Sequence, residues 1–312
     1  MSSFKTVVLE NDFLRLTMLP DIGCKIVSIY DKVNGYEWLW SDPHRPVTTP
    51  IFGDAYDHYD ISGFDECFPN IGVSLHPLDS DLLLHDHGEI WARPWKVEQS
   101  ENKVIAEISG EQMNFGFRRT ITLVGRKVNF DYQVTNSGDE NLVYLWSAHP
   151  LFKVTGEMVI SCSTNHPMTK EFGFSERMSP NGSDGGEGRF NSYTWPTVTN
   201  GDGQEFDISQ ISLAHPLTDK VTLEIAKGAE FELRDKETSR AMTLTIPQGN
   251  ISHIGICYNL GAWPFGDHPA SWVALEPTNG CTDRLDYSYE KGAFRDLPAT
   301  QIEDWNYHME FN

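Results

Sequence analysis

Short segments that alternate apolar and polar residues recur along the chain, and this period of two is the feature that most restricts its fold. Each is rich in Val, Ile, Leu, Thr, Phe or Tyr and soon meets a Gly, Asn, Asp or Pro, which is typical of antiparallel strands. The segments are residues 13–19, 24–30, 103–109, 117–125, 127–136, 220–226, 229–235, 240–247 and 251–259. No long stretch places apolar residues at the 3.6 spacing of a helix. The pattern therefore predicts an all-β sandwich rather than βαβ units.

Turn signals separate several of these segments. Asn34-Gly35 is the strongest short hairpin signal, and it lies between the apolar runs IVSIYD and YEWLW. Residues 136–141 and 233–241 are rich in turn-forming and charged residues, and we expect them to form two further hairpin tips.

Two stretches are long and irregular, at residues 41–82 and 165–209. A long loop in a compact domain is more often functional than idle, and the first of these also holds aromatic and acidic residues. The Gly- and Ser-rich segment 180–188 is the candidate linker, but strands of the same kind lie on both sides of it. We therefore expect a single domain over residues 1–312.

The net charge of −21 restricts the possible partners. A chain this acidic repels nucleic-acid phosphates and anionic lipid headgroups, which argues against nucleic acid and membrane surfaces. No apolar stretch reaches the roughly 18 residues that span a bilayer, and the first residues lack the apolar core of a signal peptide. Five scattered cysteines without a CxxC motif favour reduced thiols. We expect a cytoplasmic protein that acts on a small molecule.

His149 and Glu276 are candidate acid–base residues because each follows an apolar run. His149 comes after LVYLW, and Glu276 ends the apolar segment WVAL. We expect Glu276 at the end of a strand, at the edge of a cleft, where burial raises the pKa of a carboxyl group and suits it to act as a general base. A lone histidine is by default a satisfied core residue, so that interpretation of His149 stays open.

His85, His87 and Glu89 alternate, which on a strand would place three potential metal ligands on one face. A cupin-type iron or manganese site would instead need a carboxylate at Ile90 or Trp91, and no later His has a ligand spacing. We expect no metal, and we retain a metal-dependent sugar isomerase or lyase only as a third hypothesis. The plain alternative is that both histidines are polar loop residues.

Five segments in a fixed order carry motifs of one known family. They are MLPDIGCKIVSIYDKVNGYEWLW (18–40), DHGEIWARPWKV (86–97), FRRTITLVGRKVNFDYQVTNSGDENLVYLWSAHPLF (117–152), VALEPTNGCTDRL (273–285) and AFRDLPATQIEDWNYHMEF (293–311). Together they resemble the galactose mutarotase-like superfamily, which comprises the aldose 1-epimerases and their relatives. The resemblance implies a large antiparallel β-supersandwich with a carbohydrate cleft across one sheet, and no cofactor.

The resemblance also implies a reaction and roles for three residues. Glu276 would remove the proton of the anomeric hydroxyl, His149 would protonate the ring oxygen, and His87 would hold and polarise the sugar. The ring opens, C1–C2 rotates, and the ring closes as the other anomer. These roles agree with the chemistry of the reaction, in which one group must take a proton while another gives one. Each proton transfer by a positioned group raises the rate typically ~10²–10⁴-fold. The alternative function is a non-catalytic carbohydrate-binding module on the same scaffold.

Further residues are candidates for contacts with the sugar. Aromatic rings suit its apolar face, and the candidates are Trp91, Trp146 and Trp263. Arginine forks suit its hydroxyls, and the candidates are Arg93, Arg118 and Arg119. Alternation sends one of the two adjacent arginines inward and the other outward. The opposing interpretation is that the tryptophans are core residues and the arginines belong to a solvated face.

The acidic pair Asp65-Glu66 lies in a segment, residues 53–72, that has no counterpart we can place in the galactose enzymes. We expect Asp65 to line the cleft and to read the hydroxyl pattern of the sugar. A solvated acidic loop is an equally good interpretation of this pair.

Overall fold

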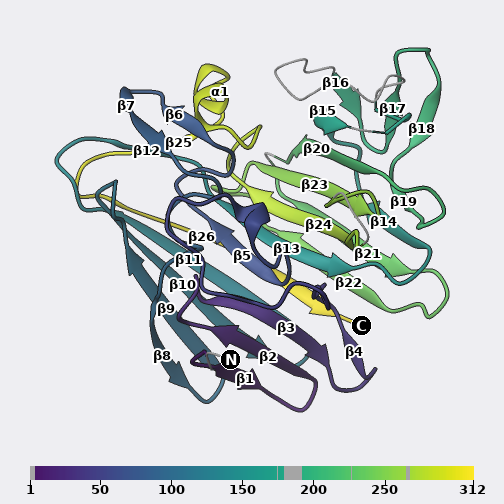
Figure 1. Cartoon of the computed structure of the whole chain (residues 1–312), viewed down its shortest axis with the longest axis horizontal. Coiled ribbons are helices and arrows are strands. Elements are labelled where there is room, and N and C mark those ends of the chain that lie inside the picture. The colour runs from purple at the N-terminus through teal and green to yellow at the C-terminus, as the bar shows by residue number, and fades with distance from the viewer. Residues whose placement is uncertain (1–3, 174, 179–191, 226, 265–267) are drawn as a thin grey trace.

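The computed structural model describes residues 4–173, 175–178, 192–225, 227–264 and 268–312, and in them two large antiparallel sheets are stacked (Figure 1). In these residues the larger sheet has 13 strands, and one of them, β4 (Tyr36–Glu37), pairs only with β3. The other strands follow the order β1 (Val7–Glu10), β2 (Leu14–Leu19), β3 (Lys25–Asp31), β5 (Phe64–Cys67), β13 (Ser147–Lys153), β24 (Ser271–Thr278), β23 (His253–Leu260), β20 (Thr218–Glu224), β15 (Pro167–Gly173), β16 (Ser192–Thr194), β17 (Thr197–Thr199) and β18 (Glu205–Asp207).

The smaller sheet has nine strands within the described residues. Their order is β19 (Gln210–Ile211), β14 (Met158–Cys162), β21 (Ala229–Asp235), β22 (Ala241–Ile246), β26 (Ile302–Phe311), β11 (Lys127–Asn136), β10 (Phe115–Val124), β9 (Lys103–Ser109) and β8 (Lys96–Ser100). Two further ribbons lie in the described part of the chain: β6 (Ser74–His76) pairs with β7 (Asp79–Leu84), and β12 (Leu142–Tyr144) pairs with β25 (Arg295–Leu297).

Helical structure is short. The helix α1 (Leu285–Glu290) contacts β6 at one end of the sandwich, and the 3₁₀ turn η1 (Tyr56–His58) precedes β5 (Figure 1). No helix in the described part of the chain has the length and apolar character that crossing a bilayer requires.

The core lies between the two sheets. One continuous cluster of buried apolar residues includes members from both ends of the chain, Val7 and Phe311. Phe64 of the larger sheet packs on Phe130 of the smaller one, with ring centroids 5.5 Å apart. Burying large aromatic rings between two sheets supplies most of the favourable free energy of such a sandwich.

The nine alternating segments found in the sequence all form strands, namely β2, β3, β9, β10, β11, β20, β21, β22 and β23. The Asn34-Gly35 hairpin is confirmed, because β3 pairs with β4 across it, and residues 233–241 join β21 to β22 as predicted. The prediction for residues 136–141 is wrong, because β11 and β12, which flank them, belong to different sheets.

The stretch 41–82 is less irregular than its composition indicated. Its second half contains β5, β6 and the start of β7. β5 was missed because its residues FDEC are buried on both sides and so do not alternate in polarity. The stretch 165–209 includes β15 to β18, and the proposed linker 180–188 lies outside the described residues.

Strand β5 sends alternate residues to opposite faces of the larger sheet. Phe64 and Glu66 of β5 face the sandwich core, where Glu66 contacts Arg119 of β10. Asp65 therefore points away from the core, to the outer face. A second apolar cluster lies on that face, where loop residues Tyr56 and Trp91 join strand residues.

A partly buried histidine at the start of β23, His253, makes stability depend on pH. Burial lowers the pKa of His253 to about 4, whereas an unfolded histidine titrates near pH 6.5. Between these values the unfolded chain binds a proton that the folded chain does not, so the free energy of unfolding falls as pH drops from 6.5 to 4. Allowing for its partial exposure, we expect a loss of about 2 kcal/mol from this group.

Urea unfolding at pH 7 and pH 4.5 tests this expectation. His253→Gln should lose less stability over the same interval than the wild type. An equal loss in both proteins would contradict the assignment.

Candidate active site

Asp65, His149 and Glu276 form one row across the outer face of the larger sheet. The register of β5 and β13 pairs Asp65 directly with His149. The register of β13 and β24 pairs Ser147 with Thr278 and Leu151 with Ala274, which brackets His149 and Glu276. Side chains opposite each other on neighbouring antiparallel strands lie about 5 Å apart at Cβ. The sheet itself therefore sets the spacing of the three groups.

His149 and Glu276 face each other at short range. The Nε2 atom of His149 lies 3.7 Å from Oε1 of Glu276, and the two side chains are 9% and 1% exposed. The sequence placed Glu276 at the end of its strand, but β24 continues through Pro277 to Thr278, so the carboxylate belongs to the strand interior. This makes its position more rigid than a strand end would.

Three buried polar atoms in this row have no hydrogen-bond partner among the described residues. They are Oδ1 of Asp65, Nδ1 of His149 and Oε1 of Glu276. Leaving a buried polar group unsatisfied costs about 1–3 kcal/mol, so three of them in one row are evidence of a ligand site.

The other oxygen of each carboxylate is held by a buried lysine. Lys220 of β20 donates to Oε2 of Glu276 at 2.6 Å. On the other side of His149, the Nζ atom of Lys25 lies 3.1 Å from Oδ2 of Asp65 and 2.7 Å from Oδ2 of Asp60. His149 thus lies between two carboxylates, each with one anchored and one free oxygen.

Burial shifts the pKa values of the central pair in opposite directions. It raises the pKa of Glu276, and the positive charge of Lys220 opposes this effect. It lowers the pKa of His149 well below the usual value, and the nearby His87, Lys220 and Lys25 act in the same direction. Perturbed groups of opposite type at this distance are typical of acid–base chemistry.

His87 reaches the site from a tight turn after β7. Its backbone φ is 58° and that of Gly88 is 76°. A Cβ atom on Gly88 would lie 2.1 Å from the carbonyl oxygen of Phe68, so only glycine fits there. Nδ1 of His87 lies 2.9 Å from Oδ1 of Asp86, and its Nε2 has no hydrogen-bond partner in the part of the chain that the structure describes.

Aromatic rings fix the orientation of His87 toward the pair. It stacks on Tyr56 at 4.0 Å, and its ring lies 5.0 Å from that of His149. Tyr56 donates to Oδ2 of Asp65 at 2.9 Å, and the Trp91 ring packs edge-on against Tyr56 at 5.1 Å. His87, Trp91 and Asp65 therefore surround the His149 side of the row.

Comparison with known protein families matches the chain to the model of the aldose 1-epimerase family over residues 5–244. The chain belongs to the aldose 1-epimerase family. The match ends before β24, so the place of Glu276 in this member of the family rests on the geometry above. A comparison with curated proteins found no match.

Solved structures share the fold of this family member. A galactose mutarotase related enzyme from Lactobacillus acidophilus is 14% identical, with 99% of this chain and 97% of that chain covered and a TM-score of 0.68. Slr1438 from Synechocystis sp. PCC 6803 is 15% identical, with 100% and 96% covered and a TM-score of 0.70. A galactose mutarotase-like protein from Lactobacillus casei is 17% identical, with 99% and 100% covered and a TM-score of 0.65. The predicted β-supersandwich of galactose mutarotase type is confirmed.

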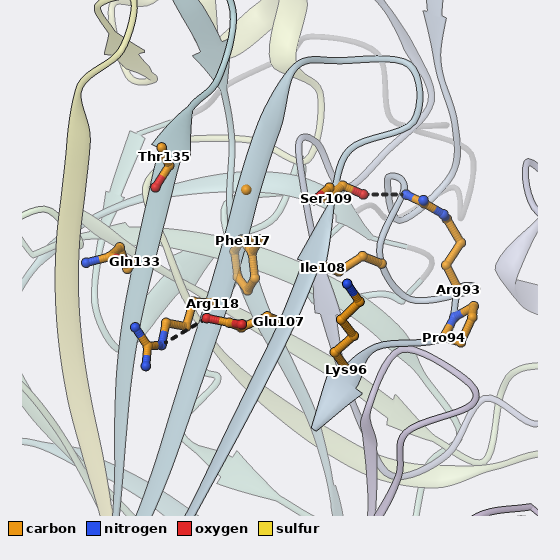
Figure 2. A pocket seen from close by; sticks show the side chains of 11 residues that line it. Arg93, Pro94, Lys96, Glu107, Ile108, Ser109, Phe117, Arg118, Gln133 and Thr135 are labelled. Atoms are coloured by element: carbon orange, nitrogen blue, oxygen red, sulfur yellow. Dashed lines mark hydrogen bonds and ion pairs between the residues drawn. The ribbon is translucent and has the colours of Figure 1, made fainter. Parts of the chain in front are cut away.

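The structure does not bring Arg93 and Arg118 to the row. Arg118 lies on β10 and points to the outer side of the smaller sheet. Its side chain is 43% exposed, and its Nε atom lies 3.4 Å from Oε1 of Glu107. Figure 2 shows Arg118 beside Glu107 and Arg93 reaching toward Ser109, in a hollow of about 420 Å³ that both arginines line. Because this hollow is on the smaller sheet, the predicted contact of Arg118 with a sugar held by His149 is not supported by its position.

The structure places Trp146 and Trp263, two of the tryptophans predicted to contact a sugar, on opposite sides of the larger sheet. Trp146 is fully buried between the sheets, where its Nε1 donates to Glu66 at 2.9 Å, so its ring is not available to a sugar. Trp263 packs against the outer-face cluster that contains Trp91.

The alternation of His85, His87 and Glu89 does not form a ligand face. Glu89 instead accepts backbone N–H groups from Glu111, Gln112 and Met113, at 2.5, 3.1 and 3.1 Å. The His85 ring packs edge-on against Phe52 at 5.2 Å. Among the described residues, no three or more His, Cys, Asp or Glu side chains are grouped to hold a metal ion.

Lys25, Tyr56 and Lys220 are part of the site but were not found in the sequence. Both lysines occupy polar positions of alternating strands, where a lysine is normally solvated. Tyr56 lies in a stretch without periodicity. Strand pairing brings the two lysines to the row, and the fold of the loop before β5 brings Tyr56 to Asp65.

Proposed function

We propose that this member of the aldose 1-epimerase family is a mutarotase that interconverts the anomers of a reducing sugar. The observation that carries the proposal is the His149–Glu276 pair, 3.7 Å apart, with its free polar atoms in one row with Asp65. One group of the pair takes protons and the other gives them, which is what anomer exchange requires.

In this proposal Glu276 takes the proton of the anomeric hydroxyl through Oε1. The C1–O5 bond breaks as the C1 carbonyl forms, and protonated His149 gives its proton to the ring oxygen O5. After rotation about C1–C2 the two transfers run in reverse, so the sugar leaves as the other anomer and the enzyme is unchanged. No other reactant is consumed.

The remaining residues of the site have supporting roles in the proposal. Oδ1 of Asp65 accepts a hydrogen bond from a sugar hydroxyl. This oxygen is available because Lys25 contacts the other one, Oδ2. His87 presents Nε2 to a second hydroxyl, and Trp91 supports the ring stack behind it. In this arrangement the sugar is held over His149, so that its reacting atoms lie close to the acid and the base.

Anomer exchange measured by NMR saturation transfer over a panel of aldoses and uronates tests the proposal. We expect accelerated exchange for at least one sugar, and a loss of about 10²–10⁴-fold in His149→Asn, because one proton transfer loses its catalyst. Circular dichroism checks that the variant is folded.

Two results would contradict a mutarotase. One is a folded wild type that accelerates none of the sugars, while saturation-difference NMR still detects binding of one of them, which identifies a non-catalytic carbohydrate-binding module. The other is an unchanged rate in His149→Asn.

A further inference from the structure

Within the described residues, the Nζ atom of Lys220 hydrogen-bonds to two carboxylates. Its Nζ atom lies 2.6 Å from Oε2 of Glu276, and 2.7 and 3.0 Å from Oδ1 and Oδ2 of Asp283. The side chain is only 5% exposed. An ammonium group has three donors, and here all are directed at these two side chains, so Lys220 fixes the orientation of the Glu276 carboxylate.

The backbone beside Glu276 leaves room for this contact. Gly255 of β23 is the direct neighbour of Glu276 in the sheet and of Thr222 on β20. A Cβ atom at Gly255 would lie 2.9 Å from Oε2 of Glu276 and 3.3 Å from Cε of Lys220. Lys220 and Glu276 thus reach each other across strand β23. The space that they use is the space that a side chain at residue 255 would fill.

We infer that Lys220 is a positioning residue that turns Oε1 of Glu276 toward His149 and stabilises the ionised form of the Glu276 carboxylate. The catalytic role that this inference gives to Glu276 rests on the proposed function. The contact of Lys220 with Glu276 is a feature of the structure and does not depend on that proposal.

The protonation state of Glu276 matters because burial favours the neutral, protonated form of a carboxyl group. Burial is the largest cause of the raised pKa of Glu276 and of the lowered pKa of His149. A protonated Glu276 cannot act as the base. Lys220 is in direct contact with Glu276, so its charge opposes protonation of the carboxyl more than that of the imidazole.

Other charged or titratable groups also face the pair from the surrounding elements. Among the described residues they include His149 on β13, His87 on the loop after β7, Lys220 on β20, Asp283 after β24, Glu171 on β15, Cys257 on β23, Asp65 and Cys67 on β5, and Lys25 on β3. The negative charge of Asp283 raises the pKa of Glu276, whereas the positive charge of Lys220 lowers it. Removing each charge should therefore have opposite effects.

Carbon-13 NMR titration of the Glu276 carboxyl, with the ring signals of His149, tests the inference without any sugar. Lys220→Met should raise the pKa of Glu276 by about 1–3 units, because a cation at this distance lowers a carboxyl pKa by that much. Asp283→Asn should lower it. Lys32→Met is the matched control, since Lys32 contacts Glu10 at 2.6 Å on the surface. No shift in Lys220→Met beyond that of the control would overturn the inference.

The pH dependence of kcat/KM adds a readout that loosened packing would not produce. In Lys220→Met both limbs of the profile should move to higher pH, because the charge of Lys220 lowers the pKa of Glu276 and of His149. The rate at neutral pH should fall, by at most about 10³-fold, which is the upper limit that a rise of 3 units in the pKa of Glu276 allows. Lys220→Arg keeps the charge and should keep the limbs in place. A lower rate with unmoved limbs in Lys220→Met would leave a structural role only and overturn the inference.

The two proposals can fail separately. If the wild type exchanges no sugar, the mutarotase proposal fails, and the NMR titration still decides the role of Lys220. If Lys220→Met does not fold, Asp283→Asn carries the test, because Asp283 is 22% exposed and its replacement keeps the lysine. A Glu276 pKa in Asp283→Asn that is unchanged or higher would then overturn the inference.

Discussion

Glu276→Gln should lower the rate of anomer exchange by about 10²–10⁴-fold, the contribution of one positioned proton-transfer group. The substitution keeps the shape of the side chain, and the amide oxygen can still accept the 2.6 Å hydrogen bond from Lys220. An amide cannot take the anomeric proton, so the base is lost while the surroundings of His149 persist. Saturation-transfer NMR at matched protein concentration measures the effect.

The matched control for this variant is Glu232→Gln. Glu232 pairs with Arg234 at 2.6 Å, but its side chain is 31% exposed and lies on the smaller sheet, so the rate should not change. A Glu276→Gln enzyme that retains more than about a tenth of the wild-type rate would remove Glu276 from the mechanism, since even the low end of the range exceeds that loss.

Arg119→Met should cost about 3–5 kcal/mol of unfolding free energy, the usual effect of removing one partner from a buried ion pair. Arg119 and Glu66 are both 0% exposed, with Nη1 of Arg119 3.0 Å from Oε1 of Glu66. Arg119 also donates to the backbone oxygen of Cys24. Without the guanidinium, the Glu66 carboxylate stays buried and keeps, among the described residues, the hydrogen bonds from Tyr132 and Trp146, at 2.8 and 2.9 Å.

The neighbouring residue supplies a control in the same strand. Arg118→Met removes an exposed charge that approaches Glu107 at 3.4 Å, and its effect should stay within about 1 kcal/mol. Urea unfolding measures both variants. Adding Glu66→Gln to Arg119→Met should restore part of the lost stability, because the unpaired charge is then gone. Equal losses at Arg118 and Arg119 would contradict the burial of the ion pair.

The strands with clear alternation could be predicted from the sequence, and so could the acid–base candidates. β10 shows why, because its sequence FRRTITLV assigns one arginine to each face and the structure agrees. His149 and Glu276 were selected by their place in apolar runs and by the family resemblance, and the structure brings them to 3.7 Å. Local pattern is enough for these because strand periodicity is a local property.

The partners of the acid–base pair could not be predicted. Lys220 lies 56 positions from Glu276 in sequence, and their contact depends on the order β24–β23–β20 and on the absence of a side chain at Gly255. Asp65 could not be distinguished from a solvated acidic residue either. β5 is buried on both sides, so its sequence shows no alternation that would identify it as a strand. Non-local register decides these contacts, and one sequence does not encode it visibly.

The row of Asp65, His149 and Glu276 is built on hydrogen-bonded strands, whereas Tyr56, His87 and Trp91 belong to connecting segments. This division has a consequence for how the protein can change over generations. Insertions and substitutions in the segments 41–63 and 85–95 can remodel what the site accepts without disturbing the spacing of the groups in the strands. Selection for a new sugar, in nature or in a directed-evolution library, should therefore act first on these two segments and leave β5, β13 and β24 unaltered.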